Sequence, residues 1–143
     1  MKVCIDASLV LKLFINEPLS EDISNLWESW VLERVERIAP SFFSIEIISA
    51  LRKLGKRGLI NPDIEKSAVE IFVREFLPTI RIYDVNSELL RRAWEISKEL
   101  DFMHVYDAIY IVLAEREGCT FWTADSKLYK ACKREFPFLR FIT

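Results

Sequence analysis

Short apolar runs alternate with longer segments of helical periodicity along the chain. The runs at residues 3–5, 80–83, 120–123 and 138–142 have the length and composition of strands, and residues 38–40 form a shorter stretch of the same kind. Between these runs, apolar residues recur every three or four positions, as in amphipathic helices. The alternation predicts an α/β domain with a mostly parallel β-sheet flanked by helices on both faces.

Local signals indicate where the helices begin and end. We expect helices over residues 7–15, about 20–35, 42–57, 62–77, 87–100, 105–117 and 126–136. The expected start signals are Pro18 with Ser20, Ser41, Asn61 with Pro62, and Asn86 or Ser87, and the expected stops are Gly58 and Gly118.

The second predicted helix carries a continuous apolar stripe. It is formed by Ile23, Leu26, Trp27, Trp30, Val31 and Val35. We interpret the stripe as core. The alternative is that part of it stays exposed as a groove for an amphipathic partner segment.

Length and charge limit the classes of protein to consider. The chain has 143 residues, 51% of them hydrophobic and 29% charged, which is typical of one soluble globular domain. Its net charge of -2 argues against nucleic-acid binding through bulk positive charge, so such binding would need a local basic patch or bound cations. No segment looks like a signal peptide or a membrane span, and we expect a cytoplasmic protein.

Asp6 and Asp125 each follow a predicted strand. In open parallel sheets, ligands bind beyond the carboxyl ends of the strands. Both residues are therefore candidates for a functional site. The alternative is that each is a loop aspartate that caps the next helix.

Asp107 is the only charged side chain in residues 105–114, a segment that is apolar on all sides. Such a helix should be buried, and an unpaired buried carboxylate is costly unless its pKa rises. Asp107 is therefore a third candidate. The alternative is a first-turn aspartate that the helix N-terminus stabilises.

Glu46 lies within the helix predicted over residues 42–57. The core stripe of that helix runs through Ile47, Leu51 and Leu54, about one residue round from Glu46. Glu46 therefore borders an apolar face, which makes it a fourth candidate. The alternative is a solvated surface glutamate.

Four converging carboxylates would repel one another unless cations bind between them. Oxygen ligands favour Mg²⁺ or Mn²⁺, whereas a single His and the absence of paired Cys argue against zinc. A divalent ion would also turn an acidic pocket into one that binds phosphate, in keeping with the net charge of -2.

The motifs around these acids occur in a recognisable order. They are residues 3–8, which include Asp6, the helix 44–54 with Glu46, the Tyr-Asp-Ala-Ile-Tyr run at 106–110, and Thr-Ala-Asp at 123–125. In this order, and across the whole chain, the sequence resembles the PIN-domain family, and within it the VapC-type toxins of toxin–antitoxin pairs.

The resemblance implies one PIN-like domain over residues 1–143, with the four acids around one or two Mg²⁺ or Mn²⁺ ions. It implies endonucleolytic cleavage of RNA, a homodimer, and a VapB-like antitoxin whose tail covers the active groove. By the same match, Ser8 and Thr123 would orient carboxylates or metal-bound water, although each could equally be a cap or strand-end residue. His104 departs from the family pattern, and we interpret it as a partly buried loop residue.

The expected reaction is metal-assisted hydrolysis of a phosphodiester bond. We expect Asp6, Asp107 and Asp125 to bind the metal and Glu46 to bind it or to act as a base. The candidates for RNA contacts are Lys12, Arg52, Lys53, Lys56, Arg57 and Lys127. The alternative for the basic run at residues 52–57 is a solvated helix face.

Three other functions compete with a toxin ribonuclease. A PIN nuclease in RNA processing is the nearest, and a catalytically inactive PIN-like scaffold is the second. A phosphatase or phosphoacceptor that uses Asp6 as the nucleophile is disfavoured, because Ser8 stands where such a site would need a second aspartate.

Overall fold

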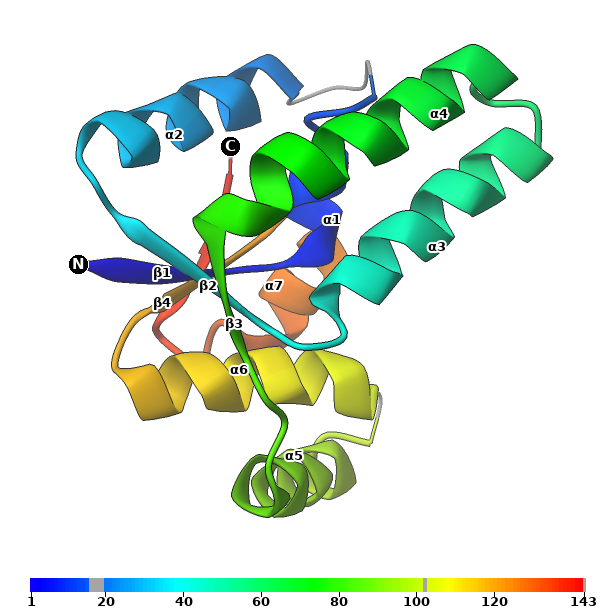
Figure 1. Ribbon diagram of the computed structural model, residues 1–143. Coiled ribbons are helices and arrows are strands. Elements are labelled where there is room, and N and C mark those ends of the chain that lie inside the picture. Colours follow the sequence, from blue (N-terminus) through cyan, green and yellow to red (C-terminus); the bar gives the residue numbers. More distant parts are fainter. Residues whose placement is uncertain (16–19, 102, 143) are drawn as a thin grey trace.

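The computed structural model describes residues 1–15, 20–101 and 103–142, so the helix start expected at Pro18 lies outside the described residues. Five parallel strands form one sheet in the order β3-β2-β1-β4-β5 (Figure 1). They are β1 (Lys2–Ile5), β2 (Glu36–Pro40), β3 (Ile80–Tyr83), β4 (Thr120–Thr123) and β5 (Leu139–Phe141). The predicted parallel sheet is confirmed, and the stretch at residues 38–40 belongs to a strand.

The strand order reverses direction between β1 and β4. From β1 the chain moves outward through β2 to β3 on one side, and β4 returns to pair with β1 on the other. The backbone N–H of Asp6 extends the β1–β4 pairing by donating to the carbonyl of Trp122 at 3.0 Å. A crevice forms beyond the strands at such a reversal because the connections that leave the two strands diverge.

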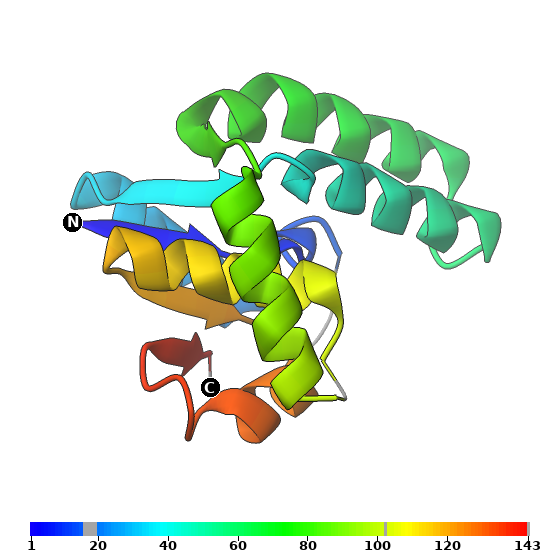
Figure 2. The ribbon, with the colours of Figure 1, turned by 90° about the horizontal axis from the view of Figure 1, so that it is seen from below.

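Helices cover both faces of the sheet, as predicted. They are α1 (Ala7–Leu11), α2 (Ser20–Leu32), α3 (Phe43–Lys56), α4 (Pro62–Ile71), α5 (Ser87–Glu99), α6 (Val105–Glu117) and α7 (Ser126–Cys132). Helices α5 and α6 lie on one face and α2 on the other, while the α3–α4 hairpin projects past the end of the sheet where the strands finish (Figure 1). The view from below shows α5 crossing in front of α6 (Figure 2).

Helix α6 is the most deeply buried helical segment. Residues 108–114 are all buried because α6 packs against β1, β2 and β4 on one side and α5 on the other. The all-round apolar pattern of residues 105–114 is explained by this enclosure. One consequence is that the start of α6 is held firmly against the central strands.

Most of the predicted helix signals are confirmed. Asn61 and Asn86 cap α4 and α5 by accepting from the backbone N–H groups of Ile64 at 2.8 Å and Leu89 at 2.9 Å. Gly58 and Gly118 follow α3 and α6 with φ of 71° and 63°, in the left-handed region that favours glycine.

Several predicted boundaries are wrong. Ser41 does not cap α3, because residues 41 and 42 form a turn and Phe42 takes the N-cap position without a side-chain bond. Helix α1 ends at Leu11, four residues early, and a turn follows it.

Two further helices also end before the predicted residue. Helix α4 ends at Ile71 and continues as a π-helical turn, η1 (Phe72–Phe76), and a 3₁₀ turn, η2 (Leu77–Thr79). Helix α7 stops at Cys132 rather than at residue 136. After Ile71 the backbone stays helical as far as Leu77, the residue before Pro78, but with π-helical hydrogen bonding.

The apolar stripe of α2 is mainly core, as interpreted. Ile23 and Trp30 are buried, and the half-buried Trp27 packs its ring 5.4 Å from that of Phe76. Val31 is the exception, with half of its side chain exposed. No helix among the described residues is long and apolar enough to cross a membrane.

Candidate active site

Asp6 is held by two hydroxyl groups at the junction of β1 and β4. Its Oδ2 atom accepts hydrogen bonds from Thr123 Oγ1 at 2.7 Å and Ser8 Oγ at 2.9 Å. The same hydroxyls accept from the backbone N–H groups of Asp125 at 3.0 Å and Ala124 at 3.2 Å. Ser8 and Thr123 therefore tie the loop after β4 to the carboxylate after β1.

Burial raises the pKa of Asp6, and the bonds from Thr123 and Ser8 partly offset this by favouring the ionised form. Asp6 occupies the N-cap position of α1 but makes no side-chain capping bond. The helix-cap interpretation therefore does not hold for this residue. The backbone N–H of Ser8 also lies close enough to this carboxylate to lower its pKa.

Asp125 combines a structural bond with an exposed position. Its Oδ1 atom caps α7 by accepting from the backbone N–H of Leu128 at 3.1 Å. The capping interpretation is therefore correct for Asp125. The residue is exposed to solvent and contributes to raising the pKa of Asp6 through charge repulsion, so it also belongs to the acidic cluster.

Asp107 lies half-buried in the first turn of α6. Burial, together with repulsion from Asp6 and Asp125, raises its pKa from 3.8 to about 6. Within the described part of the chain, no N–H or O–H group donates a hydrogen bond to this carboxylate. Among the described residues, the N-terminus of α6 therefore makes no direct hydrogen bond to Asp107. The oxygens of this carboxylate are available to a ligand.

Glu46 is tied to α6 through a tyrosine. The buried hydroxyl of Tyr110 donates to Glu46 Oε1 at 2.7 Å. Burial raises the pKa of Glu46, the Tyr110 bond lowers it, and the charges of Asp6 and Asp107 raise it again. Glu46 borders the buried residues Ile47 and Leu51, as its position on α3 predicted.

Tyr110 was not among the candidates from the sequence. Its ring lies between Phe42 and Phe121, which hides the polar role of its hydroxyl in an apolar segment. The available signal was its spacing, because residues three apart on a helix share a face, and Tyr110 follows Asp107 by three.

The four carboxylates are electrostatic neighbours. Asp6 is coupled to Asp107, Asp125 and Glu46, and Asp107 is also coupled to Asp125 and Glu46. For Asp6, Asp107 and Glu46, burial is the largest cause of the raised pKa, and repulsion from the neighbouring negative charges adds to it.

The side chains suit a hard divalent cation. Across residues 1–15, 20–101 and 103–142, no group of three or more His, Cys, Asp or Glu side chains is arranged to hold a metal ion. The donor set is nevertheless one of carboxylate oxygens with neighbouring hydroxyls, which is the chemistry that Mg²⁺ and Mn²⁺ prefer. A cation near Asp6, Asp107 and Asp125 would also relieve their repulsion.

The predicted RNA-contact residues lie in different surroundings. Arg52 on α3 donates from Nη1 to both carboxylate oxygens of Glu65 on α4, at 2.6 and 2.7 Å, so its charge is already paired. Lys53 lines a hollow of about 540 Å³ together with Glu46 and Tyr106. Lys53 is thus beside the acidic cluster, whereas Arg52 joins two helices.

The remaining basic candidates flank other helices. Lys127 is exposed in the first turn of α7, two residues after Asp125. Lys12 is half-buried just after α1, and Lys56 and Arg57 are exposed at the end of α3.

His104 is exposed at the N-cap position of α6, not partly buried as expected. Its charge lowers the pKa of Asp107, so it lies near the cluster.

The strand order and the acidic cluster point to one class of protein. The family model described as PIN domain matches residues 3–134, and the chain belongs to that family. Within the family, it is similar to proteins named as VapC ribonucleases.

Ribonuclease VapC3 of Pyrobaculum aerophilum is 29% identical over 128 residues, which cover 90% of this chain and 92% of that protein. VapC ribonuclease Mb0985 of Mycobacterium bovis is 29% identical over 135 residues and 94% of each chain. Among solved structures, VapBC2 from Rickettsia felis, bound to a DNA fragment from its promoter, matches the whole of both chains with a TM-score of 0.70 at 17% identity. That last likeness concerns the fold.

Proposed function

We propose that the protein is a metal-dependent endoribonuclease, the toxin of a VapBC-type pair, and that Mg²⁺ or Mn²⁺ is its cofactor. The observation that carries the proposal is the half-buried Asp107 carboxylate, which has no hydrogen-bond donor among the described residues and faces the charges of Asp6 and Asp125. The similarity to VapC ribonucleases supports RNA as the substrate.

Asp6, Asp107 and Asp125 would hold the ion. When bound, it would lower the pKa of a water molecule and stabilise negative charge on the attacked phosphate. Thr123 and Ser8 orient Asp6 through its Oδ2 atom. Asp125 presents its second oxygen while Oδ1 caps α7.

In this proposal Glu46 acts as the general base. Its Oε1 is occupied by Tyr110, which leaves Oε2 to accept a proton from the attacking water. The raised pKa of Glu46 suits this role, because a base works best when its pKa approaches the working pH. Attack by water rather than by the ribose 2′-hydroxyl leaves a 5′-phosphate on the product.

Cleavage of a labelled single-stranded RNA tests the proposal. We expect cleavage with Mn²⁺ or Mg²⁺, none with EDTA, and products with 5′-phosphate ends. Asp6→Asn should abolish cleavage, while Glu28→Gln, which removes an exposed acid on α2, should leave it unchanged. Activity that survives EDTA or Asp6→Asn would contradict the proposed mechanism.

We also propose a VapB-like antitoxin as the partner. The α3–α4 hairpin exposes Leu59 and Ile64, and a hollow of about 640 Å³ between it and Phe14 is lined mostly by apolar side chains. Large exposed apolar surfaces of this kind mark protein contacts. The VapBC2 complex among the similar structures supports a partner of this type.

Inhibition by the product of a neighbouring small gene tests the partner. We expect the antitoxin to bind and to stop RNA cleavage by the wild type. Ile64→Asp should escape inhibition, whereas Leu32→Asp, which changes an exposed leucine of α2, should not. Equal inhibition of both variants would place the antitoxin elsewhere.

A homodimer is the third part of the proposal. Leu90 and Trp94 of α5 have about half of their side chains exposed, 48% and 58%, and form a second apolar surface. Light scattering of the purified protein should give twice the chain mass. A measured mass equal to that of a single chain would contradict the dimer.

A further inference from the structure

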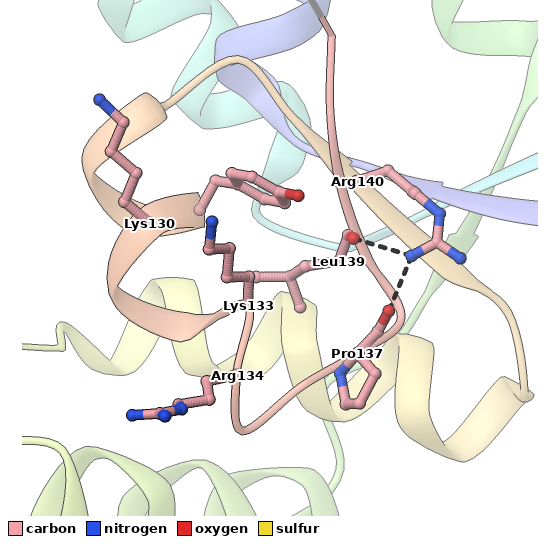
Figure 3. A pocket seen from close by; sticks show the side chains of 7 residues that line it. Lys130, Lys133, Arg134, Pro137, Leu139 and Arg140 are labelled. Carbon is pink, nitrogen blue, oxygen red and sulfur yellow. Dashed lines mark hydrogen bonds between the residues drawn. The ribbon is translucent and has the colours of Figure 1, made fainter.

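A basic hollow lies at the edge of the sheet, between α7 and β5. It has a volume of about 840 Å³, and Lys130, Lys133, Arg134 and Arg140 line it together with Tyr129. Lys130 projects from α7, Lys133 and Arg134 project from the turn that follows it, and Arg140 projects from β5 (Figure 3). None of the predicted RNA-contact residues is among them.

The local charge differs in sign from that of the whole chain. Residues 126–142 carry five basic side chains and one acidic side chain, Glu135, so this segment has a charge of +4 (five minus one) in a chain of net charge -2. A positive region in an otherwise acidic protein creates a local field that attracts anions.

The cations of the basic hollow are not neutralised by the protein. Elsewhere, arginines pair with glutamates; the pairs involve Arg52, Arg74, Arg81, Arg92 and Arg116. None of the four cations of the hollow forms an ion pair with a described residue. Arg140 instead donates from Nη1 to the carbonyls of Pro137 at 2.7 Å and Leu139 at 2.9 Å, which fixes its guanidinium and leaves Nη2 and Nε for a ligand (Figure 3).

The basic hollow is connected to the acidic cluster through helix α7. Asp125 caps this helix, and Lys127 and Lys130, three residues apart, share one side of it. Lys130 follows Asp125 by five residues, which is about 7.5 Å at helical rise. Lys133 and Arg134 lie in the turn that follows the helix.

An aromatic ring forms part of the lining. Tyr129 stacks on Phe141 with ring centroids 5.6 Å apart, and the Lys133 ammonium group lies 5.6 Å from the centre of the Tyr129 ring. Cations beside an aromatic ring are the combination that binds single-stranded nucleic acid, because phosphates contact the cations and bases stack on rings. An acidic peptide would use the cations but not the ring.

We propose that the basic hollow binds phosphates of the RNA strand outside the scissile bond and so holds the substrate across α7. This inference rests on the proposed ribonuclease function. Lys130, Lys133, Arg134 and Arg140 are positioning residues in this scheme, since they do not touch the reacting phosphate.

RNA binding measured by fluorescence anisotropy tests the inference. A labelled single-stranded RNA is titrated with the Asp6→Asn protein, in which the substrate should stay intact, with and without Lys133→Gln and Arg134→Gln. Two lost phosphate contacts should weaken binding about twentyfold at 0.1 M salt and reduce the slope of log affinity against log salt by about 1.4. The matched control carries Lys66→Gln and Arg91→Gln, two exposed cations of α4 and α5, and should bind like its parent.

Cleavage kinetics distinguish positioning from chemistry. With Asp6 restored, the Lys133→Gln, Arg134→Gln protein should show a KM about twentyfold higher and a kcat within about twofold of the wild type. A lower kcat at unchanged KM would overturn the positioning role. Circular dichroism should show the same folded state for both double variants, since all four positions are exposed.

The outcomes separate this inference from the proposed function. If the wild type cleaves RNA and the basic-hollow variant binds and cleaves like the control, the inference is wrong and the ribonuclease stands. If the wild type binds RNA without cleaving it, and the basic-hollow variant loses that binding, the role of the hollow stands and the proposed ribonuclease activity does not. If only binding of a poly-glutamate peptide is lost, the hollow serves an acidic protein partner and the inference is overturned.

Discussion

The hydroxyl of Tyr110 gives a buried aromatic residue a direct part in the candidate site. Its 2.7 Å bond holds one oxygen of Glu46, a side chain from another helix, while the ring fills the core against Phe121. The bond lowers the pKa of Glu46 against the effect of burial. Removing the hydroxyl alone therefore tests the hydrogen bond of Tyr110 while its ring still fills the core.

Tyr110→Phe should reduce RNA cleavage by about tenfold, because a hydrogen bond to a charged group contributes about 1.5 kcal/mol or more. Without the bond, the pKa of Glu46 should rise, and the acid limb of the pH–rate profile should move to higher pH. Tyr106→Phe is the control, since Tyr106 is exposed and its hydroxyl bonds to no described residue. An unchanged pH profile in Tyr110→Phe would argue against Glu46 as the base.

Asp107→Asn should stabilise the metal-free protein in a pH-dependent way. The pKa of Asp107 is raised to about 6 in the folded protein and is 3.8 in the unfolded chain, so the wild type loses stability as pH rises from about 4 through 6. Removing the charge should raise the free energy of unfolding by about 1 kcal/mol at pH 7, after allowance for solvent screening, and by little at pH 4.

Urea unfolding in EDTA at several pH values measures this difference. Asp101→Asn, at an exposed position, is the control and should follow the wild type. A stability difference for Asp107→Asn that is the same at pH 4 and pH 7 would show that the carboxylate is not strained in the folded state.

At the scale of the element, Asp125 is both a candidate catalytic residue and the N-cap of helix α7. One oxygen of Asp125 caps the helix, the helix carries Lys130 of the hollow, and the turn after it carries Lys133 and Arg134. A substitution at the start of α7 can therefore affect both stability and activity. The two effects can be separated because asparagine caps helices as well as aspartate does.

Asp125→Asn should keep the stability of the wild type and lose RNA cleavage by about hundredfold or more, because the amide retains the cap but is a poor metal ligand. Asp125→Ala should lose cleavage and about 1 kcal/mol of stability. Asn86→Ala, which removes the cap of α5, should lose similar stability and keep its activity. Full cleavage by Asp125→Asn would exclude Asp125 from the site.

At the scale of the whole molecule, strand order assembles the site. Because β4 returns to pair with β1, the residues after both strands meet, and α6, which packs against both strands, brings Asp107 close to Asp6 and Asp125. The result is a set of charges that the apo protein holds at a cost. A cation that relieves this cost should bind the folded state and stabilise it.

Mn²⁺ should raise the melting temperature of the wild type. At a concentration about 100 times the dissociation constant, binding contributes about 2.7 kcal/mol, which corresponds to roughly 8–10 °C for a domain of this size. Asp6→Asn should show a much smaller rise, and Glu28→Gln a rise like that of the wild type. Equal shifts in all three proteins would mean that Mn²⁺ binds elsewhere.

The sequence by itself determined the alternation of strands and helices and most of the helix ends, because burial and backbone preference leave local, periodic patterns. It also indicated Asp6, Asp107 and Asp125, since a strand end and a lone charge in an apolar helix are visible along the chain. Its errors were local as well: Ser41 and the ends of α1, α4 and α7 depend on how each turn packs.

Only the tertiary structure decided which distant groups meet. The strand order, the bond between Tyr110 and Glu46, the pairing of Arg52 with Glu65, and the basic hollow between α7 and β5 each join segments that are separate in sequence. A pattern of apolar positions specifies which side of an element is buried but not which neighbour buries it. The four carboxylates became one candidate site because the chain returns β4 to the side of β1.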